Sequence, residues 1–317
     1  MSPGTMACLA RPTDRPHLAM FMNDTLQDTA RTALACLDLT SLNDGDDAAA
    51  MGALCARAAG PAGPPAALCV WPRLVAQARA GAPAGVRVAG VANFPYGGTD
   101  VAAAVADARA IVAAGGDEVD LVLPWRALLG GNATGDATAG VAGAVTGGVT
   151  GAVTGAVSGA VSGAVSGAAA GAALAAALVA AVRVACAGRT LKLIIESGDL
   201  ADPALIRQAC QIGLDAGVDF LKTSTGKTAT GATPAAARVM LGAIAGHPRG
   251  AAVGFKASGG IRTVADAAVY IALVRELLGA DAATPQRLRF GASGLLADIE
   301  AVLSGQAAGP MAPAGTY

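Results

Sequence analysis

Short apolar stretches recur along the chain and alternate with longer segments of helical character. The stretches lie at 33–40, 66–72, 86–95, 117–124, 191–198, 218–226, 251–260 and 287–294. Most are rich in Val, Ile, Leu or Phe, and near-continuous apolar runs of this length are typical of parallel strands buried on both faces. The pattern therefore predicts eight parallel strands.

Alanine-rich segments with helical spacing separate these strands, at 99–115, 172–186, 202–217, 233–246 and 263–277. Four of them are preceded by a residue that commonly caps a helix: Thr99, Asp202, Thr233 and Thr263. Proline follows two of the caps, at the first helical position, where it is best tolerated. Strands alternating with helices predict an α/β fold, most simply a single-domain (β/α)8 TIM barrel. An open doubly wound sheet is the alternative, but no GxGxxG motif follows the first strand, which counts against a dinucleotide-binding fold.

One segment breaks this pattern after the fourth predicted strand. From 143 to 171, glycine recurs at every fourth residue in units close to GAVS or GAVT. Each glycine costs a helix about 1 kcal/mol relative to alanine, so we expect a repeat insert that is disordered or only partly helical, with a helix resuming at 172. The small-xxx-small spacing would also suit a packed membrane helix. Ala, Gly, Ser and Thr supply little transfer energy, which argues against that alternative.

The predicted organisation is an N-terminal extension at 1–30, a barrel over 31–304 interrupted by the insert at 138–171, and a flexible C-terminal tail at 305–317. The length of 317 residues suits one barrel of roughly 250 residues with additions. The first residues contain no continuous apolar run of the kind found in secretory signals, so we expect none.

Charge and cysteine content exclude several classes of function. The net charge is −1 and no basic run occurs, which argues against a protein that binds nucleic acid by neutralising phosphates. The six cysteines are scattered without a CxxC pair, and the chain has two histidines. We therefore expect no metal site, no disulfide scaffold and a location in the reducing cytoplasm.

The lysines are few and are placed at strand ends. Only four of the 22 basic residues are lysine: Lys192, Lys222, Lys227 and Lys256. A lysine amine can lose its proton and attack a carbonyl, whereas arginine stays protonated. Lys222 and Lys256 end successive strands, which lie about 4.8 Å apart when paired. Burial and a second positive charge would lower the pKa of the first amine and make it nucleophilic. The alternatives are chance survival of lysine, side chains that point outward, or phosphate binding.

Acidic residues interrupt two of the apolar strands. Strand alternation places Glu118 and Asp120 on the same side of the fourth strand. A carboxylate that points into a barrel needs a partner, and the two strand-end lysines would supply one. Asp120 could then transfer protons, although an ordinary buried ion pair is the alternative. The first strand carries a similar group, Asp38, with Thr40 and Asn43 beyond it.

Glycines follow the sixth, seventh and eighth strands, at Gly226, at Gly259 and Gly260, and in the segment 291–294. Barrels often bind phosphate with the loops after their last strands, through backbone N–H groups and a helix N-terminus. Glycine lets those amides approach an anion closely. Ordinary turns use the same residues, but three such loops on consecutive strands favour an anion site.

These segments together resemble the 2-deoxyribose-5-phosphate aldolases, a family of class I aldolases with a (β/α)8 barrel. The resemblance rests on LDLTSLND, VANFPYG, DEVDLVLPWRALLGG, LKLIIESGDL, DFLKTSTGK, VGFKASGGIRT and RFGASGLL, and it spans about 33 to 300 apart from the insert. It implies reversible cleavage of 2-deoxy-D-ribose 5-phosphate to acetaldehyde and D-glyceraldehyde 3-phosphate, with no cofactor and no metal. The implied partners are small phosphosugars and aldehydes, with no nucleic acid and no membrane, and a homodimer is left open.

The resemblance also implies roles for individual residues. Lys222 would form the Schiff base and Lys256 would lower its pKa. Asp120 would transfer protons with Lys256 and a water, and Asp38 would support that relay. The residues expected around the substrate phosphate are Thr225, Gly226, Lys227, Gly259, Gly260, Arg262, Ser293 and Gly294. Cys69 matches a cysteine near the pocket in some members, and Tyr317 matches a terminal tyrosine that visits the site.

The chain departs from the family pattern in the phosphate turn. Gly294 stands where a second serine is usual, which removes one hydroxyl contact and leaves the backbone N–H, so we expect weaker phosphate binding. Ala257 and Ser258 replace the more usual proline and alanine, a change expected to have a mild effect. Two other interpretations stay open. One is a Schiff-base aldolase for another phosphorylated aldehyde, and the other is a phosphosugar-binding barrel without activity.

Overall fold

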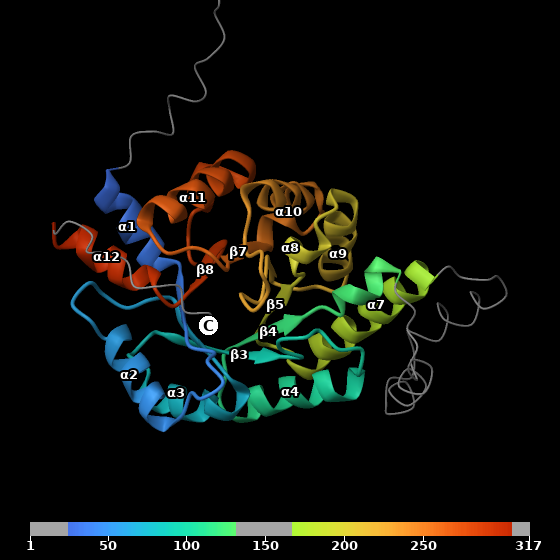
Figure 1. Ribbon diagram of the computed structural model, residues 1–317, viewed down its shortest axis with the longest axis horizontal. Helices are drawn as coiled ribbons and strands as arrows, with labels where there is room; N and C mark the ends of the chain where they lie inside the picture. The colour runs from blue at the N-terminus through green and yellow to red at the C-terminus, as the bar shows by residue number, and fades with distance from the viewer. Residues whose placement is uncertain (1–24, 131–166, 306–317) are drawn as a thin grey trace, which may run out of the picture.

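The computed structural model of the protein describes residues 25–130 and 167–305 (Figure 1). Eight parallel strands pair in chain order, β1 to β8, and β8 pairs with β1 to close the barrel. The strands are β1 (Leu37–Thr40), β2 (Ala67–Val70), β3 (Arg87–Ala92), β4 (Glu118–Val122), β5 (Thr190–Ile194), β6 (Phe220–Lys222), β7 (Gly254–Ser258) and β8 (Leu288–Ala292). Seven lie within the predicted stretches, and β5 begins one residue before its stretch, at Thr190. This confirms the single-domain (β/α)8 barrel and excludes the open doubly wound sheet.

Helices surround the barrel on its outer side (Figure 1). Helix α1 (Leu26–Ala35) precedes β1 and begins inside the expected N-terminal extension. The other α-helices are α2 (Ala48–Ala58), α3 (Val75–Gly81), α4 (Val101–Ala113), α7 (Gly167–Ala185), α8 (Ser197–Leu200), α9 (Pro203–Asp215), α10 (Pro234–Gly246), α11 (Val264–Leu278) and α12 (Leu295–Leu303). Short 3-10 helices are η2 (Pro72–Leu74), η3 (Trp125–Leu129), η4 (Gly250–Ala252) and η5 (Ala280–Ala282).

Three of the four predicted helix caps are confirmed. The side chains of Asp202, Thr233 and Thr263 each accept a hydrogen bond from a backbone N–H in the first turn of α9, α10 and α11. The prediction of Thr99 as the cap of α4 is wrong by one residue. Asp100 caps this helix, because its side chain accepts the bond from the N–H of Ala103.

The main hydrophobic core lies between the strands and the surrounding helices. On β5 and β6, Leu191, Leu193 and Leu221 belong to this core, whereas the alternate residues Lys192 and Lys222 do not. A separate apolar cluster contains Cys69 of β2 together with Leu42, Ala89 and Val91, with Trp71 and Phe94 packed against it. Because side chains alternate along a strand, the barrel interior is apolar beside β2 and β3 and charged beside β4 to β8.

Helix α7 begins at Gly167, five residues before the predicted position of 172. A Cβ on Gly171 would overlap the backbone oxygen of Ala127 in η3, so glycine lets the two segments touch. Leu174, Leu178 and Val182 of α7 are buried. Close packing therefore holds these first glycines in a helix in spite of their low propensity.

Within the described ranges, α7 alone is long and apolar enough to cross a membrane by length and composition. In this fold it is the helix between β4 and β5, packed against α4, η3 and α9. Residues 1–24, 131–166 and 306–317 lie outside the described residues. They include positions 138–166 of the expected insert at 138–171 and, apart from Gly305, the expected tail at 305–317 with Tyr317.

Replacing Gly171 by alanine should destabilise the protein by roughly 2 kcal/mol, because the new methyl group meets backbone that cannot rotate away. Gly242 in α10 is the matched control, since a Cβ there has no neighbour within 4 Å. Gly242→Ala should stabilise by about 0.5–1 kcal/mol. Urea unfolding of both variants measures the difference, and equal effects of the two substitutions would contradict the close approach.

Candidate active site

The strand register brings lysine side chains from neighbouring strands to one level of the barrel. Lys222 on β6 pairs in register with Lys256 on β7, which pairs in turn with Arg289 on β8. Asp120 on β4 pairs with Lys192 on β5. In register, alternate side chains of parallel neighbours point to the same side of the sheet. These charged groups therefore meet inside the barrel.

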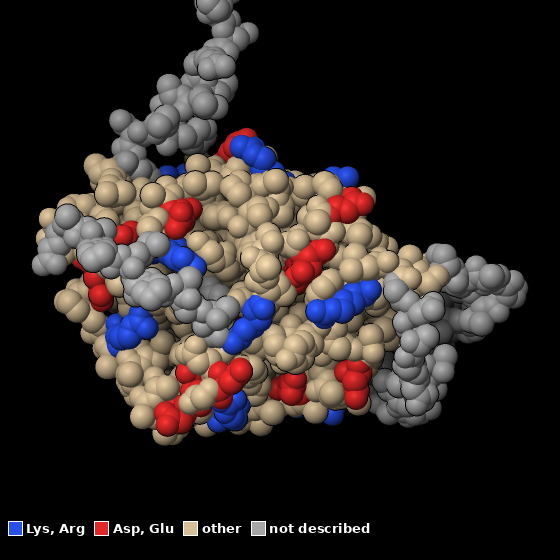
Figure 2. Space-filling model, in the orientation of Figure 1, with Lys and Arg blue, Asp and Glu red and all other residues tan. Residues whose placement is uncertain are grey.

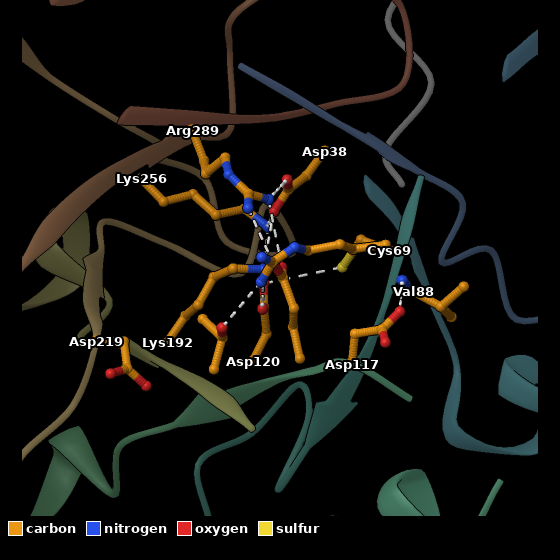
Figure 3. A network of polar contacts seen from close by, with 12 residues as sticks. Asp38, Cys69, Val88, Asp117, Asp120, Lys192, Asp219, Lys256 and Arg289 are labelled. Carbon is orange, nitrogen blue, oxygen red and sulfur yellow. Dashed lines mark hydrogen bonds and ion pairs between the residues drawn. The ribbon is translucent and has the colours of Figure 1, made fainter. Parts of the chain in front are cut away.

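Lys222, Lys256 and two carboxylates form a continuous hydrogen-bonded group. The Nζ of Lys222 donates to Oδ2 of Asp120 at 2.9 Å. The Nζ of Lys256 donates to the same oxygen at 2.8 Å and to Oδ2 of Asp38 at 2.5 Å. Figure 3 shows Lys256, Asp38 and Asp120 converging on this point. The structure thus brings together the four residues expected to be catalytic, and all four side chains are buried.

Three further charged residues extend this group. Two of them were not predicted from the sequence to be site residues. Lys192 donates to Oδ1 of Asp120 at 2.9 Å and to Oδ2 of Asp38 at 3.0 Å, and it also contacts Glu118. Arg289 donates from Nη1 to Oδ1 of Asp38 at 2.5 Å and from Nη2 to Oε1 of Glu118 at 2.9 Å. Lys192 and Arg289 were missed as site residues. Their signal in the sequence is a charge flanked by apolar neighbours in a predicted strand.

We call this set the buried charge network: Asp38, Glu118, Asp120, Lys192, Lys222, Lys256 and Arg289. It contains four cationic side chains and three carboxylates, all buried. Ionisation of every member would leave one surplus positive charge away from water, which is costly. Loss of one proton from a lysine would remove that surplus.

Lys222 is the lysine from which the proton leaves most easily. Burial lowers the pKa of Lys222, and the charge of Lys256 lowers it further, while Asp120 opposes both. Burial also acts to lower the pKa of Lys192 and of Lys256, but Asp120 and Asp38 outweigh it and raise both values. The arrangement therefore makes Lys222 easier to deprotonate than Lys256.

Asp120 and Asp38 are held in the ionised form. Burial acts to raise the pKa of each carboxyl, but the surrounding cations outweigh it and lower the pKa below the ordinary range. For Asp120 these cations are Lys192, Lys222 and Lys256. An ionised carboxylate in contact with both Lys222 and Lys256 can accept a proton from either one.

The expected phosphate residues lie in the loops after β6, β7 and β8. Gly226, Gly259 and Gly260 have φ between 79° and 85°, a conformation that favours glycine. Arg262 is exposed, and its backbone N–H donates to Asp266. Ser293 accepts from Arg57 through its backbone oxygen. Gly294 precedes α12 without a side-chain cap, and a Cβ there would meet nothing within 4 Å.

Thr225 forms hydrogen bonds with an acidic residue rather than facing an open site. Its Oγ1 donates to Oε2 of Glu196 at 2.7 Å, and its backbone N–H donates to the same carboxylate. Glu196 is buried and has a φ of 54°, a conformation that the sequence of an apolar strand end does not reveal. Thr225 therefore serves to hold the loop after β6 against Glu196 in this structure.

The other predicted residues within the described ranges are Thr40 and Cys69 on β1 and β2, Asn43 after β1, and Lys227 after β6. Thr40 donates to the backbone oxygen of Asp38, and Asn43 donates to Asp46. Lys227 reaches across toward this β1 loop, with its Nζ 4.0 Å from Oδ1 of Asp44. Cys69 is fully buried with its Sγ 3.8 Å from Oδ2 of Asp120, and burial raises the pKa of its thiol.

Charge on the outer surface is mixed in sign. Figure 2 shows lysine and arginine side chains interspersed with aspartate and glutamate on one face of the molecule. Among residues 25–130 and 167–305, no group of three or more His, Cys, Asp or Glu side chains is arranged to hold a metal ion.

The barrel thus places two buried lysines on neighbouring strands, with Lys222 at the carboxyl end of β6. The prediction that Lys256 ends its strand is wrong, because β7 continues to Ser258. Residues 145–298 match the family model described as DeoC/LacD family aldolase. This match agrees with the resemblance seen in the sequence and supports assignment as a lyase.

Solved structures share this fold at low sequence identity. An apo structure from Toxoplasma gondii ME49, described as a putative deoxyribose-phosphate aldolase, is 22% identical with a TM-score of 0.70, covering 89% of this chain and 98% of its own. A Coccidioides immitis protein of the same description is 23% identical with a TM-score of 0.63, covering 86% and 87%. A tetrameric deoxyribose phosphate aldolase from Aeropyrum pernix is 20% identical with a TM-score of 0.60, covering 92% and 99%.

Proposed function

We propose that this protein is a class I aldolase that cleaves 2-deoxy-D-ribose 5-phosphate reversibly to acetaldehyde and D-glyceraldehyde 3-phosphate. One observation carries the proposal. The buried amine of Lys222 lies beside Lys256 and 2.9 Å from Asp120, at the carboxyl end of β6, the end at which barrel enzymes place their chemistry. The family match and the folds of the similar structures support the same assignment.

In the synthetic direction, the neutral Nζ of Lys222 attacks the carbonyl carbon of acetaldehyde. Loss of one water gives a protonated imine that acts as an electron sink. Removal of a proton from the methyl carbon gives an enamine, and this carbon attacks the aldehyde carbon of D-glyceraldehyde 3-phosphate. Addition of water then releases the product and restores the amine. Cleavage follows the same steps in reverse.

Asp120 and Lys256 are the groups placed to move protons in these steps. Asp120 contacts both amines through one oxygen, Oδ2, so a proton that leaves one of them has an acceptor at hydrogen-bond distance. Asp38 holds Lys256 from the other side at 2.5 Å and keeps it charged. We propose that the resulting positive field keeps Lys222 ready to react.

The loops after β6, β7 and β8 would hold the substrate phosphate. The proposal takes Lys227 and Arg262 as the positive charges, and the backbone amides beside Gly260, Ser293 and Gly294 as further donors. Gly294 precedes the N-terminus of α12, where amides are unsatisfied within the helix. Thr225 would support the loop through Glu196 rather than contact the phosphate.

Incubation of the purified protein with 2-deoxy-D-ribose 5-phosphate tests the proposal. Equal amounts of acetaldehyde and D-glyceraldehyde 3-phosphate should form, and Lys222→Ala should form neither. Cleavage of a different phosphorylated sugar alone would indicate an aldolase for another aldehyde. Substrate binding without any cleavage would indicate a phosphosugar-binding barrel and contradict the proposal.

Gly294→Ser should strengthen phosphate recognition. Serine at this position has room, adds a hydroxyl beside the turn and can cap α12. KM for the phosphorylated substrate should fall by about threefold to tenfold, the value of one typical hydrogen bond, with kcat unchanged. Gly294→Ala is the matched control and should not lower KM. An equal KM in the wild type and the serine variant would place the phosphate elsewhere.

A further inference from the structure

Glu118 and Arg289 lie in the barrel interior but make no contact with Lys222 among the interactions of the described residues. Glu118 is the first residue of β4, two positions before Asp120. Arg289 occupies β8 in register with Lys256. Both are buried, with Glu118 at 0% and Arg289 at 3% exposure. A buried charge pair in this position needs a reason beyond stability, since apolar residues of similar volume often stabilise a core as well.

Arg289 is fixed by contacts in several directions. Its Nε donates to the backbone oxygen of Pro285 at 2.6 Å, and its guanidinium lies 5.6 Å from the ring centre of Phe220. Its two terminal nitrogens bind Asp38 at 2.5 Å and Glu118 at 2.9 Å. Glu118 also contacts Lys192 and, at 3.5 Å, Arg87. The pair is therefore rigid and has a defined place in the charge network.

We propose that Glu118 and Arg289 are positioning residues that set the charge state of Lys222 without touching it. Each is linked to Lys222 through an intermediate group. Lys192 contacts both Glu118 and Asp120, and Asp120 contacts Lys222. Asp38 contacts both Arg289 and Lys256, the register neighbour of Lys222. The inference rests on the proposed function in that it takes Lys222 as the nucleophile.

The electrostatic surroundings of Lys222 come from several strands. The charged and titratable groups next to Lys222 are Asp120 of β4, Lys256 of β7 and Cys69 of β2. A second set of charged groups surrounds these: Lys192 of β5, Asp38 of β1, Glu118 of β4 and Arg289 of β8. Water screens charges weakly inside this buried core. A charge added or removed at Glu118 or Arg289 therefore acts on Lys222 without direct contact.

Two substitutions should act in opposite directions. Glu118→Gln removes a negative charge, so protonated Lys222 becomes less favourable and its pKa falls. Arg289→Met removes a positive charge, so the pKa of Lys222 rises. The pKa of Lys222 should shift by about one unit in each variant. This is the effect of one charge about 12 Å away when the effective dielectric constant of the protein is about 20. The double variant removes one charge of each sign and should return the pKa close to the wild-type value.

Glu118→Gln keeps the test valid even if Arg289→Met does not fold. In that variant, Arg289 retains Asp38, and Lys192 retains Asp38 and Asp120, so no buried cation is left without a carboxylate. Arg87 loses Glu118, but its side chain is 53% exposed. Arg289→Lys is the control that preserves charge, and it should leave the pKa of Lys222 near the wild-type value. Thermal unfolding of each variant shows whether it is folded.

Competitive acetylation with acetic anhydride measures the pKa of Lys222 directly. The reagent acetylates neutral amines only, and peptide mass spectrometry over a range of pH gives the midpoint for the Lys222 peptide. The method needs no turnover. A protein without aldolase activity would contradict the proposed function, whereas the acetylation result would still decide this inference.

The expected result is a lower midpoint for Glu118→Gln, a higher midpoint for folded Arg289→Met, and little change for Arg289→Lys. A purely structural role would lower the unfolding temperature and leave all midpoints equal. Equal midpoints in the wild type and Glu118→Gln would overturn the inference, as would shifts of the same sign in the two single variants.

Discussion

Lys222→Ala is expected to lower kcat/KM for cleavage of 2-deoxy-D-ribose 5-phosphate by about 10⁴-fold or more, the scale of losing a covalent nucleophile. The other lysines of the buried charge network cannot take its place. Lys256 and Lys192 are buried as well, but Asp120 and Asp38 raise their pKa and keep them protonated. Steady-state rates of acetaldehyde release measure the loss.

Two control variants separate nucleophilic from electrostatic roles. Lys222→Arg keeps the positive charge but has no amine that can be deprotonated, so it should be as inactive as the alanine variant. Lys227→Ala removes a lysine that lies outside the network and is proposed to bind phosphate. It should raise KM and leave kcat within a few fold. Activity of Lys222→Arg near the wild-type level would show that Lys222 acts only through its charge.

Lys256→Met is expected to shift the pH profile of the reaction toward alkaline values. Lys256 lowers the pKa of Lys222 through its charge, so its removal leaves Asp120 to stabilise protonated Lys222. Without Lys256, three cations face three carboxylates when Lys222 is charged, and no surplus charge favours deprotonation. The acidic limb of kcat/KM should move up by about two pH units, which lowers the rate by about 100-fold at pH values below the pKa of Lys222 in both enzymes.

The direction in which the acidic limb of kcat/KM moves shows whether Lys256 lowers the pKa of Lys222. The Lys222 amine must be neutral to attack, so kcat/KM rises as the pH increases through the pKa of Lys222. A higher pKa places that rise at higher pH. If Lys256 also transfers protons, the alkaline plateau of kcat will fall as well. A slower enzyme whose acidic limb stays in place would show that Lys256 does not set the charge of Lys222.

The sequence predicts the barrel and its central chemistry because both follow from local rules. Near-continuous apolar stretches identify the parallel strands, and a side-chain period of two places Glu118 and Asp120 on one face. The order of strands then makes Lys222 and Lys256 register neighbours, as the structure shows. Such inferences need only the spacing within a strand and the identity of the next strand.

The partners of these groups depend on barrel closure. Arg289 meets Asp38 although 251 residues separate them in the chain, because β8 pairs with β1. Lys192 contacts carboxylates from two other strands for the same reason. A charge in an apolar strand shows that a partner exists, but only the closed sheet shows which residue it is.

Backbone geometry accounts for the other differences between prediction and structure. Thr225 faces Glu196, which adopts a φ of 54° directly after the strand and so turns its carboxylate toward the β6 loop. Helix α7 includes Gly167 and Gly171, because packing against η3 offsets the low helix propensity of glycine. Neither feature has a signal in residue type alone.

Trapping of the imine tests the central claim most directly. Incubation with acetaldehyde followed by borohydride reduces an imine to a stable ethyl group on the lysine, and intact-mass spectrometry with peptide mapping locates it. The account predicts one ethyl adduct, on Lys222, that is absent in Lys222→Ala. A folded protein that gains no adduct, or one modified only at another lysine, would contradict the assignment of Lys222 as the Schiff-base residue.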